Sequence, residues 1–289
     1  MSKLAIEMVK LARNAGGSFQ TVSNRSAIIN RFAEHLLQQN IQTKKVSDLK
    51  LRHIEGYINL RLAQKIALRT LQNEMAAIRA VLLEAGRTQL VQSERLNNKS
   101  LGLSGASRDG TKTAISPERY KEAMLKALEI DRGVAACLQL SYTLGLRSEE
   151  AVQSCKSLNT WNKALKNGAP QLPVTYGTKG GRPREVTFFD HDAVCDAIGT
   201  ALTVAKEHGG NLINRPDLKS AMNRFHNVAR SIGLKGKEAP HSLRYSFSQR
   251  RIAAYIKQGL SEDEALARTS CDLGHGDGRG VYIKQVYSK

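Results

Sequence analysis

Hydrophobic residues recur at three- and four-residue intervals through most of the first 95 residues. This spacing puts them on one face of an α-helix, so it predicts a region built almost entirely of amphipathic helices. Three stripes are present, and the last ends near Gly86. The stripes consist of Ala27, Ile28, Ile29, Phe32, Ala33, Leu36 and Leu37, then Leu49, Leu51, Ile54, Tyr57, Ile58 and Leu60, then Leu71, Met75, Ile78, Ala80, Val81 and Leu82.

A polar stretch rich in Gly and Ser interrupts the helical pattern at 96–116 and predicts a linker. Ser116 and Pro117 then suit the N-cap and the first position of a new helix. The helical pattern continues from there to about Leu144. The sequence therefore predicts a helical domain over 1–95 and a second domain over 117–289.

The clearest β pattern lies between Leu172 and Phe189. Alternating residues flank a turn of Gly and Lys at 177–181, which predicts a β-hairpin. Helical patterns resume at about Asp192 and continue to the end of the chain. The predicted fold class is mainly α with a small β-hairpin or sheet (α+β).

Charge narrows the classes of partner. Among 289 residues, 44 are Lys or Arg and 26 are Asp or Glu, which gives a formal net charge of +18. Such a surplus attracts polyanions, with nucleic acid as the leading candidate. No stretch is apolar enough for a membrane span. The four cysteines are scattered and have no zinc-site spacing, which predicts no metal site and favours a reduced cytoplasmic compartment.

The first motif with candidate chemistry is Leu144-Gly145-Leu146-Arg147. Gly145 suits the left-handed residue that ends a helix, so Arg147 is expected to begin the next helix after a sharp turn. Taken alone, this motif also fits a surface arginine that pairs with Glu150, three residues later.

The second motif, Pro240-His241-Ser242-Leu243-Arg244, puts an imidazole and a guanidinium on one helical face. Arginine can bind two nonbridging phosphate oxygens, and histidine can move a proton near neutral pH. Taken alone, the motif also fits a helix-capping histidine and a solvated arginine.

The third motif, Leu273-Gly274-His275, follows a predicted helix that begins with the capping box Ser261 to Glu264. A glycine-rich run continues to Gly280. This run lacks the Gly-x-x-x-x-Gly-Lys-Ser/Thr pattern and no strand precedes it, so a nucleotide-binding loop is not expected.

In chain order, the candidates are Arg147, Lys179 in the hairpin turn, His241-x-x-Arg244, Leu-Gly-His275 and a tyrosine near the C-terminus. This order resembles that of the tyrosine recombinase family, the phage-integrase and Xer-like enzymes. The resemblance implies a helical core-binding domain at 1–95, which binds DNA, and a tyrosine recombinase catalytic domain at 117–289.

The resemblance also implies an activity. Such an enzyme is a site-specific recombinase, or integrase, of a mobile genetic element. It cleaves and rejoins DNA by transesterification through a 3′-phosphotyrosyl intermediate, and it needs no metal, ATP or other cofactor. Lys179 is then expected to be the general acid that protonates the 5′-oxygen leaving group.

The same resemblance implies a role for the other candidates. Arg147 and Arg244 would bind the nonbridging oxygens of the scissile phosphate. His241 would assist proton transfer, and His275 would hydrogen-bond the phosphate. Glu150 would orient the site rather than react.

Two tyrosines compete for the role of nucleophile. Tyr282 follows His275 by seven residues and Tyr287 follows it by 12, and neither spacing is the usual one in the family. The residues around Tyr287 resemble the family pattern better. Tyr282 is so close to the glycine-rich turn that too little chain is expected for its ring to reach the site. We therefore expect Tyr287 to be the nucleophile, with Tyr282 as the alternative.

The expected partners are double-stranded DNA and further copies of the chain, in a tetrameric synapse on DNA, with accessory DNA-bending proteins as additional partners. A nucleoid-associated location is expected. Only two residues follow Tyr287, so subunits are not expected to exchange a long C-terminal helix. Two alternative functions stay open: strand relaxation like that of a type IB topoisomerase, and a non-cleaving DNA-binding accessory protein of the same fold. The sequence reveals neither the DNA site nor the choice among integration, excision, inversion and dimer resolution.

Overall fold

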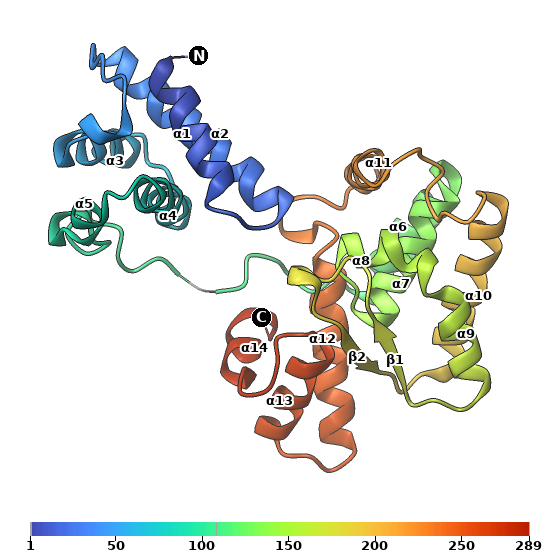
Figure 1. Cartoon of the computed structure of the whole chain (residues 1–289). Helices are drawn as coiled ribbons and strands as arrows, with labels where there is room; N and C mark the ends of the chain where they lie inside the picture. Colours follow the sequence, from blue (N-terminus) through green and yellow to red (C-terminus); the bar gives the residue numbers. More distant parts are fainter. Residues whose placement is uncertain (1, 108, 289) are drawn as a thin grey trace. The chain divides into compact units, whose positions relative to one another are not determined.

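The computed structural model describes residues 2–107 and 109–288. It divides into two compact units, 1–107 and 108–289 (Figure 1). Both units are mainly helical, and the described strands form one two-stranded antiparallel sheet. The predicted α+β fold class is therefore confirmed. None of the described helices is long and apolar enough to cross a membrane.

The first unit is a bundle of short helices whose apolar stripes meet in one core. Its helices are α1 (Lys3–Asn14), α2 (Phe19–Gln38), α3 (Leu51–Ala63), α4 (Leu68–Glu84) and α5 (Thr88–Gln92), with 3-10 turns η1 (Val46–Asp48) and η2 (Glu94–Leu96). The chain after η2 still belongs to this core, because Leu101 and Leu103 are buried in it. The assignment of DNA binding to this unit and of catalysis to the next stays a prediction.

The second unit contains the remaining helices and the hairpin. Its helices are α6 (Pro117–Ile130), α7 (Arg132–Leu144), α8 (Ser148–Gln153), α9 (Leu158–Lys166), α10 (His191–Glu207), α11 (Leu218–Ser231), α12 (Ser242–Lys257), α13 (Glu262–Asp272) and α14 (Gly280–Tyr287), with 3-10 turns η3 (Ser154–Lys156), η4 (Lys179–Gly181) and η5 (Gly236–Glu238). Helix α7 is almost entirely buried and packs against α6, α10 and α12.

Local capping signals locate several helix ends. The Ser116 hydroxyl accepts a hydrogen bond from the Arg119 amide, with Pro117 at the first helical position, as predicted. The predicted capping box of Ser261 and Glu264 is also present. The predicted helical run from 117 to 144 is two helices, because Asp131 is extended and its side chain caps α7.

The predicted hairpin is confirmed. Strand β1 (Gln171–Val174) pairs with β2 (Arg184–Thr187). In the hairpin, β2 packs on α13 and β1 contacts α9 (Figure 1). Gly177 has a φ of +71°, and a Cβ there would lie 2.6 Å from the Glu149 carbonyl oxygen. This glycine therefore lets the hairpin turn pack directly on the first turn of α8.

Candidate active site

The first catalytic candidate stands at a sharp turn between α7 and α8. Gly145 ends α7 in the left-handed conformation, with a φ of +61°. A Cβ at Gly145 would lie 2.4 Å from the ring of Phe247, so this position also requires glycine for packing. Arg147 follows as the N-cap of α8. The predicted turn is confirmed, and it anchors Arg147 to the core of the unit.

The Glu150 carboxylate forms the centre of the site. It accepts hydrogen bonds from the Arg147 amide at 2.7 Å and from Arg147 Nη1 at 2.6 Å. Arg184 donates to both carboxylate oxygens, at 2.5 and 2.8 Å. Arg244 Nη1 lies 4.0 Å from Oε2. Burial would raise the pKa of Glu150, but the hydrogen bonds and charge of Arg184, with the other two arginines, hold it at about 2.

Arg244 is completely buried, so its interpretation as a solvated arginine on a helix is wrong. Its terminal nitrogens donate to the carbonyl oxygens of Gly145 and Leu273. Its Nε has no hydrogen-bond partner among the residues that the structure describes. Burial, together with the nearby charge of Arg147, lowers the pKa of Arg244 to about 10. The protein thus holds a guanidinium where no carboxylate fully neutralises it.

The C-terminal end of α13 binds all three of these arginines through backbone carbonyls. The Asp272 carbonyl accepts from Arg184 Nε at 2.9 Å. The Leu273 carbonyl accepts from Arg147 Nη2 at 3.2 Å and from Arg244. A helix C-terminus carries partial negative charge, which favours cations. His275 follows two residues after Leu273, so this helix end brings an imidazole to the arginines.

The two candidate histidines lie beside Tyr287. His275 Nε2 is 3.2 Å from the Tyr287 hydroxyl oxygen. The His241 ring centroid is 6.2 Å from that of Tyr287. The Tyr245 ring is near both, with centroids 5.7 Å from His241 and 4.6 Å from Tyr287. Burial, with the charges of Arg244 and then Arg147, lowers the pKa of His241 to about 4 and that of His275 to about 3. Both imidazoles are therefore neutral at pH 7.

Tyr282 also reaches the site. Its ring centroid lies 5.0 Å from that of His275, so the expectation that the glycine-rich turn keeps it away is wrong. The two tyrosines differ in their surroundings. Tyr287 is buried, with 2% of its surface exposed, and its hydroxyl contacts His275, whereas Tyr282 is only partly buried.

Lys179 lies apart from this buried group. It is exposed in η4, within the connection between β1 and β2. No hydrogen bond of its ammonium to another described residue is present. For Lys179 to act as the general acid, the η4 turn would have to lie against the DNA, beside the 5′-oxygen that leaves.

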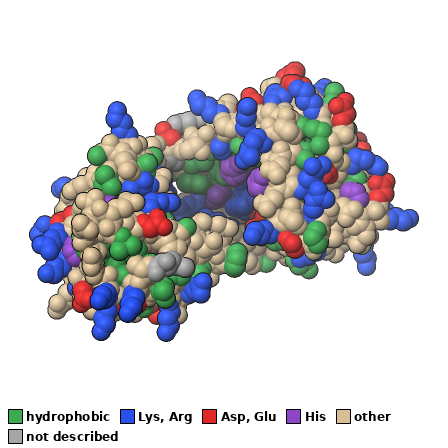
Figure 2. Space-filling view, turned by 90° about the horizontal axis from the view of Figure 1, so that it is seen from above, with side chains coloured by type: hydrophobic (Ala, Val, Ile, Leu, Met, Phe, Trp, Pro, Cys, Tyr) green, Lys and Arg blue, Asp and Glu red, His purple; other side chains and the backbone are tan. Residues whose placement is uncertain are grey.

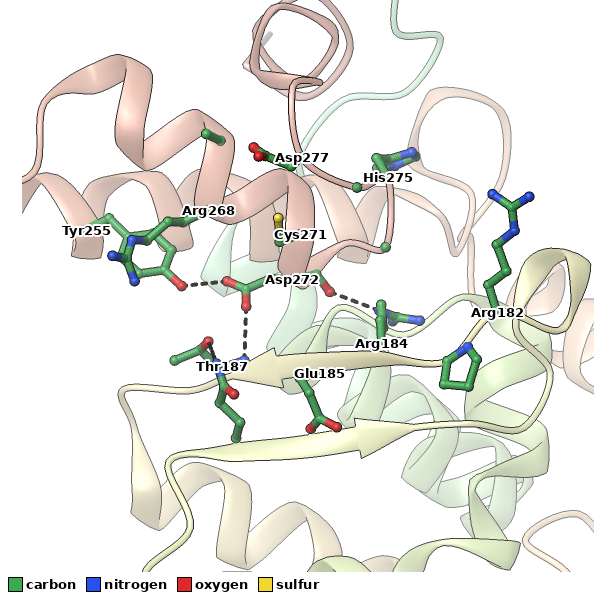
Figure 3. Close-up of a pocket in the computed structure, with 15 residues that line it drawn as sticks. Arg182, Arg184, Glu185, Thr187, Tyr255, Arg268, Cys271, Asp272, His275 and Asp277 are labelled. Atoms are coloured by element: carbon green, nitrogen blue, oxygen red, sulfur yellow. Dashed lines mark hydrogen bonds between the residues drawn. The ribbon is translucent and has the colours of Figure 1, made fainter.

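The sequence analysis missed two residues of the site, Arg184 and Asp272. Asp272 is buried and accepts from the Thr187 amide at 3.0 Å and from the Tyr255 hydroxyl at 2.8 Å. Figure 3 shows it between Tyr255 and Arg184, against β2, in a pocket that also contains His275. One signal could have revealed Arg184: it occupies the same inward register of β2 as Val186, where an unpaired charge would be costly.

Basic side chains are common on the surface of the molecule. Figure 2 shows Lys and Arg side chains spread over the visible face of the molecule, with fewer acidic ones among them. Within the described part of the chain, no group of three or more His, Cys, Asp and Glu side chains is arranged to hold a metal ion.

Two family models match the chain. The model described as "Integrase" matches residues 102–250, and the one described as "Phage integrase, N-terminal" matches residues 1–91. The chain belongs to the integrase family of tyrosine recombinases. The resemblance drawn from the motif order is therefore confirmed. No curated protein sequence is significantly similar to this integrase-family chain.

Solved structures share the fold of this integrase-family chain. The Tn1549 transposon integrase, in complex with transposon right end DNA, aligns with a TM-score of 0.62 and 13% identity, covering 99% of this chain and 95% of that one. A lambda integrase tetramer bound to a Holliday junction aligns with a TM-score of 0.59 and 16% identity, covering 95% and 74%. XerH bound to its difH substrate gives 0.58 and 15%, covering 97% and 82%.

Proposed function

We propose that this protein is a site-specific DNA recombinase that cleaves and rejoins DNA through a covalent 3′-phosphotyrosyl intermediate. One observation carries the proposal: the Tyr287 hydroxyl is hydrogen-bonded to His275, beside three arginines that share the single carboxylate of Glu150. The surplus positive charge suits a phosphodiester, whose negative charge increases in the transition state.

The proposed reaction is a transesterification. The Tyr287 oxygen attacks the scissile phosphorus, a P–O bond to tyrosine forms, and the bond to the 5′-oxygen breaks. The tyrosine proton passes to a neighbouring base, for which the neutral imidazole of His275 is in reach at 3.2 Å. Arg147 and Arg244 stabilise the charge on the nonbridging oxygens, and Lys179 protonates the departing 5′-oxygen. The 5′-hydroxyl of a partner strand then reverses these steps.

DNA cleavage in this scheme requires α14 to move. Tyr287 has 2% of its surface exposed and Arg244 has none, so a phosphate cannot approach both in the DNA-free arrangement. Helix α14 is short and ends at Tyr287, so a displacement of this one helix would expose the Tyr287 side chain. We propose that DNA binding supplies this displacement.

DNA and other copies of the chain are the proposed partners. The +18 net charge supports the first of these. Solved complexes of the same fold support both, because one contains a lambda integrase tetramer on a Holliday junction. Accessory DNA-bending proteins remain a prediction from the family resemblance.

The test is covalent capture. A DNA site is first selected from random duplexes by binding to the protein, and a nick near the scissile position then traps the intermediate. We expect wild type and Tyr282→Phe to form a protein–DNA adduct, and Tyr287→Phe to form none. Peptide mapping of the adduct identifies the modified tyrosine, and phosphotyrosine at position 282 would overturn the choice of nucleophile.

The same assays separate the alternative functions. A wild-type protein that binds its selected site but gives no adduct is a non-cleaving accessory protein. A protein that relaxes supercoiled DNA lacking paired sites, but never exchanges strands, acts like a type IB topoisomerase. The contact between Tyr287 and His275 favours a cleaving enzyme over the accessory protein.

A further inference from the structure

Arg184 joins parts of the site that are far apart in the sequence. It donates to both oxygens of Glu150, which is 34 residues away, and to the Asp272 carbonyl, which is 88 residues away. Only 4% of its side chain is exposed, and all three of its guanidinium nitrogens already donate to protein oxygens, so none is left to bind DNA. We propose that Arg184 is a positioning residue that holds Arg147, through Glu150, in the orientation needed at the scissile phosphate. This inference rests on the proposed cleavage reaction.

The link from Arg184 to Arg147 passes through one carboxylate. Arg184 donates to both oxygens of Glu150 in parallel, a geometry that fixes the plane of the carboxylate. Arg147 uses the same two oxygens: its amide donates to Oε2 and its guanidinium to Oε1. A rotated Glu150 could not satisfy both of these bonds. The orientation of Arg147 therefore depends on Arg184.

Arg184 is itself held in one conformation. Gly274 has a φ of +67°, and a Cβ there would lie 2.7 Å from Arg184 Cδ, so the backbone packs directly on the arginine stem. Asp272 fixes the strand that carries Arg184, by accepting from the Thr187 amide on β2 and from Tyr255 on α12 (Figure 3). Glycine in the Leu-Gly-His motif thus serves Arg184 as well as the helix end.

The proposed role differs from that of Arg147. Arg147 has 21% of its side chain exposed and can meet a phosphate oxygen. Arg184 has all of its guanidinium nitrogens bonded to protein oxygens. A substitution at Arg184 should therefore change how well the nonbridging charge is stabilised, without removing a group that touches DNA.

The main test variant is Arg184→Lys, which keeps the charge and loses the two-pronged bond. The matched control is Arg224→Lys, since Arg224 forms a single-carboxylate ion pair with Asp131 at 2.7 Å, outside the site. Three quantities are measured: the melting temperature, the affinity for the selected DNA site, and the single-turnover rate of adduct formation. The rate is measured on normal DNA and on DNA with a methylphosphonate at the scissile position.

Cleavage of the methylphosphonate distinguishes a misplaced Arg147 from a general loss of activity. The methylphosphonate replaces one charged nonbridging oxygen with a methyl group, so its cleavage depends less on a well-placed Arg147. We expect Arg184→Lys to bind DNA like wild type and to cleave normal DNA about 100-fold more slowly, as small misplacements can cost. On the methylphosphonate the deficit should be at least about tenfold smaller, because less charge needs stabilising. Arg224→Lys should cleave both substrates like wild type.

Equal deficits on the two substrates, or no deficit on normal DNA, would overturn the role of Arg184. If Arg184→Lys is unfolded at the assay temperature, Arg184→Gln provides the second variant, since it keeps a polar donor and loses the two-pronged bond to Glu150; the same criteria apply. Failure of wild type to form an adduct on either substrate would instead refute the proposed cleavage reaction.

Discussion

The two units each bury a glutamate beneath arginine side chains, Glu74 in the first and Glu150 in the second. Glu74 accepts from Arg31 at 2.7 Å, from Arg61 at 2.8 Å and from the Tyr57 hydroxyl at 2.9 Å. Arg31 is 46% exposed, so solvent screens much of its charge. The third group around Glu74 is thus the neutral hydroxyl of Tyr57, whereas the third group around Glu150 is an arginine.

The Glu150 cluster has a different balance of charge. Three guanidiniums face one carboxylate, and two of them, on Arg184 and Arg244, are almost inaccessible to solvent. The two arginine–glutamate clusters therefore differ in their net charge. In the Glu74 cluster, two arginines face one carboxylate and link neighbouring helices. In the Glu150 cluster, three arginines face one carboxylate, so more positive charge is left without a counter-charge. This comparison indicates that the surplus of buried charge, rather than the presence of a salt bridge, marks the site.

The largest expected effect comes from removing each carboxylate. Glu150→Gln leaves three guanidiniums, two of them buried, without a counter-charge and should destabilise its unit by about 3–5 kcal/mol. Glu74→Gln should cost less, about 1–3 kcal/mol, because Arg31 can turn toward solvent. Denaturant unfolding measures both losses. Added sulfate should recover more stability in Glu150→Gln than in Glu74→Gln, and equal recovery would contradict the difference between the clusters.

The second prediction exchanges an arginine in each cluster for an apolar residue of similar length. Arg244→Met removes two hydrogen bonds to backbone carbonyls, but it also removes a charge that burial disfavours. The two effects offset each other, so folding stability should stay within about 1 kcal/mol of wild type. Adduct formation should fall by about 10²- to 10³-fold with the loss of a transition-state contact.

The matched variant, Arg61→Met, should behave in the opposite way. It removes two hydrogen bonds from the buried Glu74 and should cost about 1–3 kcal/mol of stability. The rate of adduct formation on bound DNA should not change. A slow chemical step in Arg61→Met, or unfolding of Arg244→Met, would contradict the proposed difference between the two clusters.

The third prediction concerns glycine packing in the two units. A Cβ at Gly110 would lie 2.0 Å from the Val286 carbonyl oxygen in α14, whereas nothing lies within 4 Å of such an atom at Gly56 in α3. Gly110→Ala should therefore loosen α14 by about 1–3 kcal/mol through overpacking. Gly56→Ala should instead stabilise its helix by about 1 kcal/mol. Hydrogen exchange of the amides at 280–287 distinguishes the two, and unchanged protection in Gly110→Ala would contradict the packing argument.

The smallest expected effect is a flat pH profile. Burial and the arginine charges lower the pKa of His241 to about 4 and that of His275 to about 3, so neither gains a proton between pH 8 and pH 6. The cleavage rate at low DNA concentration reports ionisations of the free enzyme. It should show no inflection near 6.5, the ordinary value for histidine. An inflection near 6.5 that disappears in His275→Gln would show that burial and the arginine charges do not lower the pKa of His275.

Elements whose signals are local could be predicted from the sequence. Helix caps such as Ser116 and Ser261, the helix end at Gly145 and the hairpin turn depend on hydrogen bonds and backbone angles within a few residues. The order of the basic motifs likewise indicated the family, because each motif is short. Asp131 shows the limit of this approach: a smooth hydrophobic pattern concealed a helix break, although an aspartate cap is itself a local signal.

The way in which the motifs share their charges could not be predicted, because it depends on tertiary packing. Arg184 meets Glu150 and Asp272 across 34 and 88 residues, and Arg147 meets the Leu273 carbonyl across 126. Arg244 is buried rather than solvated for the same reason, since its partners are carbonyls on α7 and α13. A periodic pattern shows which face of a helix is apolar, but not which distant backbone oxygen will meet a guanidinium. That depends on how the helices pack, because hydrogen bonds act only over about 3 Å.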